Sequence, residues 1–288
     1  MIISLIAPAG TLDPALVSSL QSAFGATGDA LWLSPDEAAE FPVADRPANL
    51  EDVRRDIAPM GVDLNCLAAE NRQKSLLIAD MDSTMIEQEC IDELAAEAGV
   101  GPRVADITAR AMNGELDFNE ALIERVGLLR DLPSDIIDHV IATRITLAKG
   151  GKTLVSTMKA NGARAALVSG GFLQFTTKIA AQLGFDETRA NTLIEGNGKL
   201  TGEVGMPILG RDAKVDALMD FTVNQPEIAI AGGDGANDLG MIERAGLGVA
   251  LHAKPVVAAA APLRIDHADL TALLYLQGYA RDAFVYDK

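Results

Sequence analysis

The apolar run 76–79 ends in Asp80, and a second aspartate, Asp82, follows one residue later. Such a run bounded by charge is typical of a buried strand in a parallel sheet, and ligands of these sheets bind beyond the carboxyl ends of the strands. Residues i and i+2 of an extended segment point the same way, so both carboxylates can face one small site. Two such like charges repel unless a cation or a shared proton offsets them. Taken alone, the segment also fits an ordinary Asp/Ser/Thr turn that caps a helix.

A second apolar segment, 165–168, runs into Ser169, Gly170 and Gly171. Two glycines at a strand-to-helix turn let backbone N–H groups approach an anion closely, and the positive end of the following helix adds to the attraction. The pattern predicts a cradle for an oxyanion such as phosphate, although Ser-Gly-Gly is also an ordinary turn.

A third apolar segment, 228–231, runs into a glycine-rich loop that carries Asp234, Asn237 and Asp238. Magnesium prefers one or two carboxylates together with water and substrate phosphate oxygens. A Gly-Asp turn that caps a helix would explain one of these acids but not all of them. Lys214 lies between the second and third segments, and alone it would be a solvated surface charge. A site with up to four acids, however, needs a positive partner.

Together these segments resemble the motifs of the haloacid dehalogenase superfamily of phosphotransferases: Asp-x-Asp-x-Thr, a strand-end Ser or Thr, a Lys, and Gly-Asp-x-x-x-Asp. They occur in the family's order, at 80–84, Ser169, Lys214 and 233–238. The resemblance extends from about residue 76 to the C-terminus. It implies an α/β fold with a Rossmann-like parallel sheet, into which the helix-rich stretch after the first motif is inserted as a cap.

The sequence of that insertion narrows the resemblance to phosphoserine phosphatases. The shared features are Glu89, the stretch 111–114, Phe118, and the stretch 125–129. The resemblance implies hydrolysis of O-phosphoserine to serine and phosphate, the last step of serine biosynthesis, with Mg²⁺ as cofactor. In it, Glu89 binds the substrate ammonium and Arg125 the carboxylate, which agrees with the bidentate geometry of a guanidinium. The other substrate-binding residues that it implies are Met112, Phe118, Ser169, Gly170 and Asn237.

The same resemblance implies roles for the residues of the core. Asp80 attacks phosphorus and forms an aspartyl-phosphate, which splits one difficult displacement into two easier ones. Asp82 protonates the leaving serine oxygen and then activates water. Mg²⁺ is held by Asp80, the backbone carbonyl of Asp82, and Asp234. Ser169 and Lys214 hold the transferring phosphoryl group.

Composition restricts the classes of function. The chain has 288 residues, 49% of them hydrophobic and 23% charged, which is typical of a globular protein with one large domain or two. A net charge of −17 disfavours nucleic acid or an anionic membrane as partner. Neither a signal peptide nor a long apolar run is present, so we expect a cytoplasmic protein. Its expected partner is a small-molecule substrate, and the sequence leaves open whether the protein forms a homodimer. The two cysteines, Cys66 and Cys90, have no metal-ligand spacing and predict neither a disulfide framework nor a zinc site.

Residues 1–73 are predicted to form a small α+β unit, an ACT-like or degenerate ACT domain. Its strand count is low for a complete copy, because the stretch 34–47 reads as a Pro-rich acidic connection. The remaining elements predicted in this unit are strands at 2–7 and 30–33, helices at 14–24 and 50–57, and an apolar segment at 61–68.

From residue 74 onward apolar strands alternate with amphipathic helices, as in a parallel sheet with crossover helices. The stretch between the first two strands is too long for one crossover. We therefore predict a catalytic core of 74–87 and 150–288 with a helical cap of 88–149. Strands are predicted at 76–79, 165–168, 228–231 and 248–251, and a hairpin at 192–195 and 199–203.

Two alternatives remain open from the sequence. The same machinery could transfer the phosphoryl group to another hydroxyl, or hydrolyse another small phosphorylated metabolite. A non-catalytic amino-acid sensor belongs to another class. A decayed enzyme usually loses a catalytic residue, so the sensor is disfavoured by the complete set of Asp80, Asp82, Ser169, Lys214 and Asp234.

Overall fold

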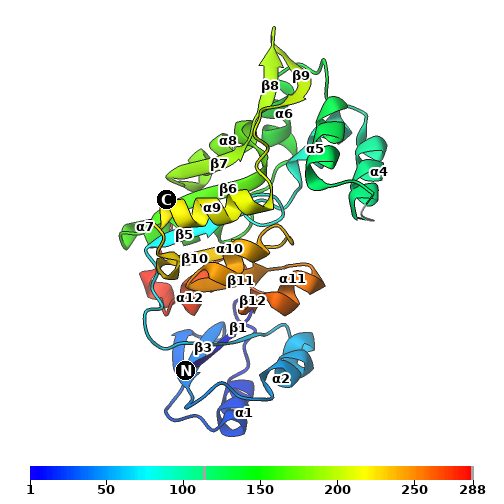
Figure 1. Ribbon diagram of the computed structural model, residues 1–288. Coiled ribbons are helices and arrows are strands. Elements are labelled where there is room, and N and C mark those ends of the chain that lie inside the picture. Colours follow the sequence, from blue (N-terminus) through cyan, green and yellow to red (C-terminus); the bar gives the residue numbers. More distant parts are fainter. Residues whose placement is uncertain (113–114, 287–288) are drawn as a thin grey trace.

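The computed structural model describes residues 1–112 and 115–286. Three parts follow one another along the long axis of the molecule: a small antiparallel sheet with two helices, a central parallel sheet, and a helical cap (Figure 1). Within the described ranges, no helix has the length and apolar character that a membrane span requires.

The central sheet has six parallel strands in the order β12-β11-β10-β5-β6-β7. The predicted strands in β5, β6, β10 and β11 are confirmed. The two edge strands, β7 and β12, were not expected from the sequence. The bounds are β5 (Leu76–Ala79), β6 (Arg164–Phe172), β7 (Glu187–Asn191), β10 (Ala229–Gly233), β11 (Leu247–Leu251) and β12 (Leu263–Ile265).

Strand β5 lies in the middle of the sheet and is buried on both faces. Leu77 and Ala79 belong to the apolar cluster that includes α7 (Gly151–Ala160), α8 (Leu173–Leu183) and α12 (Ala272–Leu276). Leu76 and Ile78 belong to the cluster on the other face, which includes α9 (Arg211–Phe221), α10 (Leu239–Arg244) and α11 (Pro255–Ala260). Burying each such side chain contributes about 1.5–3 kcal/mol, so the strand end that carries Asp80 is rigidly placed.

The N-terminal unit is a complete βαββαβ arrangement with the antiparallel order β2-β3-β1-β4. The expectations of a low strand count and of a strand-free connection at 34–47 are wrong, because β3 pairs centrally between β2 and β1. Its sequence, Ala-Ala-Glu-Phe-Pro, has little strand propensity. The bounds are β1 (Ile2–Ile6), α1 (Pro14–Phe24), β2 (Leu31–Ser34), β3 (Ala38–Pro42), α2 (Leu50–Ile57) and β4 (Asp63–Leu67).

In the part of the chain that the structure describes, four helices lie between β5 and α7, in the stretch that the sequence predicted to be a cap. They are α3 (Cys90–Glu97), α4 (Gly101–Met112), α5 (Phe118–Gly127) and α6 (Ile136–Arg144). Where the chain enters and leaves the cap, residues 85–87 pair antiparallel with residues 146–148. The cap is therefore connected to the core by a two-stranded hinge.

The predicted hairpin forms from β8 (Leu193–Gly196) and β9 (Lys199–Val204), with Asn197 and Gly198 in left-handed conformations at its turn. Its position at the cap end, where β9 packs beside α5, was not foreseen (Figure 1). Backbone hydrogen bonds join it to the cap segment 131–134: Leu200 N donates to Leu132 O at 2.9 Å, and Asp131 N donates to Leu200 O at 2.9 Å. The hairpin thus packs against the cap although it comes from the core part of the chain, after β6.

Candidate active site

Asp80 follows β5 directly, and three contacts fix its position. Its backbone N–H donates to Gly232 O at 3.0 Å, which ties it to the neighbouring strand β10. Its Oδ1 accepts the N–H of Met81 at 2.8 Å and lies 2.8 Å from Nζ of Lys214. Burial raises the pKa of Asp80, the nearby Asp238 raises it further, and Lys214 opposes both effects. The second oxygen, Oδ2, accepts no hydrogen bond from the described residues.

Lys214 lies on α9 and is buried between two carboxylates, with 2% of its surface exposed. Its Nζ lies 2.8 Å from Asp80 Oδ1 and 2.5 Å from Asp238 Oδ1. Burial alone would lower the pKa of Lys214, but the two carboxylates outweigh it and raise the pKa above the ordinary value. The ammonium therefore stays charged and neutralises part of the acid cluster. Lys214 is thus a positive partner of the acids, paired with Asp80 on one side and with Asp238 on the other.

Carboxylate oxygens of Asp80, Asp234 and Asp238 all lie within 4.8 Å of one another. Asp238 already uses both oxygens, since Oδ1 accepts Lys214 and Oδ2 accepts the N–H of Gly235 at 2.9 Å. Asp80 and Asp234 each keep an oxygen free of donors from the described residues. Burial, followed by Asp238, raises the pKa of Asp234 to about 6. Clustered hard oxygen donors of this kind fit a metal ion, which would relieve their repulsion.

Asp82 lies across from the end of β6. Its Oδ1 accepts the N–H of Cys90, the first residue of α3, at 3.1 Å. A Cβ on Gly171 would approach Asp82 Oδ2 to 2.8 Å, so glycine is required for this close packing. Burial, followed by repulsion from Glu89, raises the pKa of Asp82 to about 7. An acid with this pKa can both give and take a proton near neutral pH.

Ser169 and Gly170 lie in the last part of β6, opposite the aspartates, where the pairing of β6 with β7 is irregular between Val168 and Phe172. The prediction of a turn at 169–171 is therefore wrong, because the strand continues to Phe172. Ser169 Oγ accepts the N–H of Gly171 at 2.8 Å, and Gly170 O accepts Nδ2 of Asn191 at 2.9 Å. A Cβ on Gly170 would lie 3.5 Å from the ring of Phe118 and 3.8 Å from Asn237 Nδ2. The cap residue Phe118 therefore reaches the phosphate cradle that the sequence predicted in the core.

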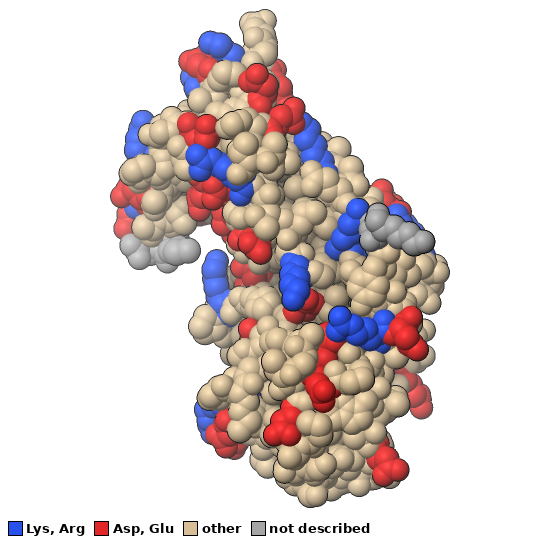
Figure 2. All heavy atoms as spheres, turned by 180° about the vertical axis from the view of Figure 1, so that it is seen from behind, with Lys and Arg blue, Asp and Glu red and all other residues tan. Residues whose placement is uncertain are grey.

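A cavity of about 160 Å³ lies between core and cap. Seen from behind, the molecule is hollowed between its upper and middle parts, and acidic side chains line the hollow (Figure 2). Lys214 lies behind Asp80, outside the lining. Met112 ends α4, but its side chain lies outside the described residues. The predicted site residues that line the cavity are Asp80, Asp82, Glu89, Phe118, Arg125, Ser169, Gly170, Asp234 and Asn237.

Lys254 is a lining residue that sequence reasoning missed. It precedes α11, its backbone N–H donates to Asp234 O at 3.3 Å, and its charge lowers the pKa of Asp234. The sequence carried one signal, an Ala-Lys-Pro step directly after the β11 strand end. A lysine before a proline at a strand end is too common to single out without the fold.

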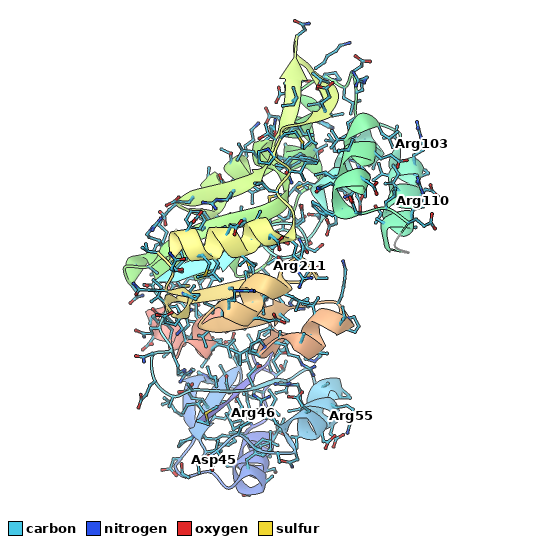
Figure 3. The ribbon with its side chains drawn as sticks, in the orientation of Figure 1. Asp45, Arg46, Arg55, Arg103, Arg110 and Arg211 are labelled. Carbon is cyan, nitrogen blue, oxygen red and sulfur yellow. The ribbon has the colours of Figure 1, made fainter. Side chains whose placement is uncertain are left out.

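Arg125 is the cap arginine that lines the cavity. Its Nε donates to Ala121 O at 3.2 Å, and burial lowers its pKa while Asp92 and Glu89 raise it. Arg103 and Arg110 instead project from α4 away from the core, and Arg110 pairs with Glu124 at 3.0 Å (Figure 3). Arg211 lies at the end of α9 that faces the cap (Figure 3). Of the cap residues that the structure describes, the cation Arg125 and the anion Glu89 both line the cavity.

Two family models, each described as haloacid dehalogenase-like hydrolase, match residues 77–243 and 212–275. The crystal structure of a HAD family hydrolase from Salmonella enterica serovar Typhi superposes with a TM-score of 0.87 and 31% identity, over 98% of both chains. This likeness includes the N-terminal unit as well as the core and cap.

Curated relatives narrow the assignment. A phosphoserine phosphatase of Streptococcus thermophilus is 47% identical over 200 residues, which are 68% of this chain and 93% of that protein. One of Archaeoglobus fulgidus is 43% identical over 226 residues, which are 77% of this chain but 65% of that protein, just under two thirds of its length. The chain therefore belongs to the haloacid dehalogenase-like hydrolases and, within them, to the phosphoserine phosphatase family.

Proposed function

We propose that this protein hydrolyses O-phosphoserine to serine and inorganic phosphate, with Asp80 as nucleophile and Mg²⁺ as cofactor. The proposal is carried by one observation: the core supplies aspartates, and the cap supplies Glu89 and Arg125, to the same cavity. The relatives described above, which bear the name phosphoserine phosphatase, support the same substrate.

The charges around the cavity complement those of phosphoserine. The substrate carries a phosphate, a carboxylate and an ammonium. Facing them in turn, the site offers a carboxylate cluster that fits a metal ion, then Arg125, then Glu89. A guanidinium binds a carboxylate bidentately, and a carboxylate pairs with an ammonium. The cavity of about 160 Å³ is smaller than a typical drug-sized ligand site, which favours a small metabolite.

In the proposed mechanism, the carboxylate of Asp80 attacks phosphorus while the bond from phosphorus to the serine oxygen breaks. Asp82 gives its proton to that leaving oxygen, so serine departs as a neutral hydroxyl and Asp82 becomes a carboxylate. Asp82 then takes a proton from water, whose oxygen attacks phosphorus and breaks the bond to Asp80. Ser169 holds the phosphoryl oxygens through both steps, Lys214 restrains Asp80 from behind, and the cap excludes bulk water.

The free oxygens of Asp80 and Asp234, together with the backbone carbonyl of Asp82, would hold Mg²⁺. Bound there, the ion would offset the repulsion among the acids and the charge of the phosphoryl oxygens. Oxygen donors without a nitrogen or sulfur ligand suit Mg²⁺ better than zinc.

The experiment that tests the function follows serine and phosphate separately after mixing the protein with L-phosphoserine, in Mg²⁺ and in EDTA. Equal amounts of both products, released in Mg²⁺ and not in EDTA, are expected, with none from Asp80→Asn. Serine without an equal amount of phosphate, accompanied by a phosphorylated form of an added alcohol, would identify a transferase. Tight binding of serine without turnover would identify a sensor.

A further inference from the structure

The turn that follows Asp82 holds a residue in an unusual conformation. Ser83 has a φ of 54°, a left-handed value that non-glycine residues seldom adopt. Its backbone N–H donates to Gln88 O at 3.2 Å, which closes the turn. The conformation directs the hydroxyl across the turn, where Oγ donates to Oε1 of Glu89 at 2.8 Å. A strained residue of this kind at a site edge points to a functional constraint.

Glu89 gains a fixed position from this contact. Its side chain is exposed at the cavity wall, and a free glutamate there would sample many rotamers. The Ser83 hydroxyl donates a hydrogen bond to Oε1 of Glu89, while Oε2 of Glu89 accepts no hydrogen bond from the residues that the structure describes. One oxygen is thus anchored, and the other remains available to a cationic group in the cavity.

The anchor is itself tied to the catalytic acid and to the hinge. The residue after Glu89, Cys90, donates its N–H to Asp82 Oδ1 at 3.1 Å. On the other side of the turn, Gln88 accepts the N–H of Thr146 at 2.8 Å and donates to its Oγ1 at 3.3 Å. The turn therefore fixes Glu89 relative to both the proton-transferring aspartate and the strand by which the chain leaves the cap.

We propose that Ser83 is a positioning residue for substrate selection: its hydroxyl orients Glu89 so that the free carboxylate oxygen receives the substrate ammonium. This inference rests on the proposed function, because it needs a substrate with an ammonium group. The Ser83 hydroxyl contacts neither the phosphoryl group nor a metal ligand in this account. Its loss should weaken recognition of the ammonium and leave the chemistry of phosphoryl transfer in place.

The test compares two ligands that differ in the ammonium. O-Phosphoserine carries it, whereas phosphoglycolate keeps the phosphate and the carboxylate and lacks it. For Ser83→Ala we expect KM for phosphoserine to rise about tenfold, as for one lost hydrogen bond to a charged group, with kcat little changed. The inhibition constant of phosphoglycolate should change much less. Equal weakening toward both ligands, or no change in either, would overturn the proposal.

Two further variants separate the hydroxyl from the backbone. Ser83→Gly relieves the left-handed strain while removing the hydroxyl, so it should match Ser83→Ala. If Ser83 served the backbone conformation alone, glycine would perform at least as well as serine, which would contradict the proposal. In the Glu89→Ala background, Ser83→Ala should add no further rise in KM, and an additive effect would show that Ser83 acts independently of Glu89.

Failure of the positioning role of Ser83 can be distinguished from failure of the proposed function. Absence of phosphoserine turnover by the unmodified protein would refute the function and, with it, the substrate role of Glu89. Normal turnover of phosphoserine with an unaltered preference in the Ser83 variants would refute the positioning role alone.

Discussion

At the residue scale, recognition and chemistry are assigned to different side chains in one small cavity. Glu89 and Arg125 come from the cap, whereas Asp80, Asp82 and Asp234 come from strand ends of the core. Substitutions in the two groups should therefore have different kinetic signatures. Loss of a cap charge should raise KM, and loss of a core carboxylate should lower kcat.

Arg125→Ala should raise KM for phosphoserine roughly 100-fold, the effect of losing charge-assisted hydrogen bonds to the carboxylate. Steady-state kinetics measure this, with phosphoethanolamine, which lacks a carboxylate, as competing ligand. Its inhibition constant should change far less. The matched control is Arg110→Ala, which removes an exposed cap arginine paired with Glu124. An equal loss for both ligands would contradict a carboxylate role for Arg125.

Asp82→Asn should lower kcat by a factor of roughly 10²–10⁴, the usual contribution of a general acid–base group. The amide can neither protonate the leaving oxygen nor activate water. Thermal unfolding and far-UV circular dichroism check that the fold is retained. A kcat near that of the unmodified protein would exclude Asp82 from proton transfer.

The sequence was most informative about the position of residues that directly follow a strand. The Asp80 and Asp82 pair and the loop of Asp234 follow strand ends and keep their spacing in the structure. The anchoring of Glu89 by Ser83 was not foreseen, because it depends on a backbone conformation that the residue types do not reveal. Lys254 was also missed, since only the fold brings it to the cavity.

At the element scale, strands that carry a dense apolar run were predicted and polar ones were not. The predicted bounds of β5, α1 and α2 agree with the observed ones. In the structure, Asp13 caps the start of α1 and Gly25 ends it. β7 was missed because Ala190 is its one apolar residue. β3 was missed because Glu40 interrupts it, and a bidentate pair with Arg72, at 2.6 and 2.9 Å, is what stabilises that buried acid.

The hairpin of β8 and β9 holds the cap from the core side, and Gly202 lies at its contact with the cap. Gly202 has a φ of 76°, and a Cβ there would approach Arg130 Cβ to 2.8 Å. Gly202→Ala should lower the free energy of unfolding by about 2 kcal/mol or more, because backbone strain and the close contact act together. Chemical denaturation measures the loss.

Gly198→Ala is the matched control for that prediction. Gly198 has a φ of 73° at the hairpin turn, but a Cβ there would meet nothing within 4 Å. It should lose only the left-handed penalty, about 1 kcal/mol. Equal losses for the two variants would mean that contact with the cap contributes nothing.

At the scale of the whole molecule, the N-terminal unit is fixed to the core by side chains that bind backbone. One face of its sheet packs on its own helices, and residues of the other face join the apolar cluster of α12. Asn65 exchanges two hydrogen bonds with the backbone of Arg264, at 2.8 and 3.0 Å. The buried Asp63 accepts backbone N–H groups of Asp266, His267 and Ala268 at 2.7, 3.2 and 2.9 Å.

Asp63→Ala should lower the free energy of unfolding by about 3 kcal/mol, because it leaves several backbone donors without an acceptor. Asp45→Ala is the matched control: this exposed aspartate of the same unit lies far from the cap (Figure 3). It should change stability by less than about 0.5 kcal/mol. If the two variants unfolded alike, the Asp63 contact would not hold the units together.

The central claim is that core and cap together select phosphoserine. It is tested most directly by measuring kcat/KM for phosphate release, in Mg²⁺, from O-phosphoserine, phosphoglycolate and phosphoethanolamine. The account predicts that phosphoserine is preferred by at least tenfold over each partial analogue, because only it engages both Glu89 and Arg125. Equal efficiency on all three, or a preference for an analogue, would contradict the roles of both cap residues.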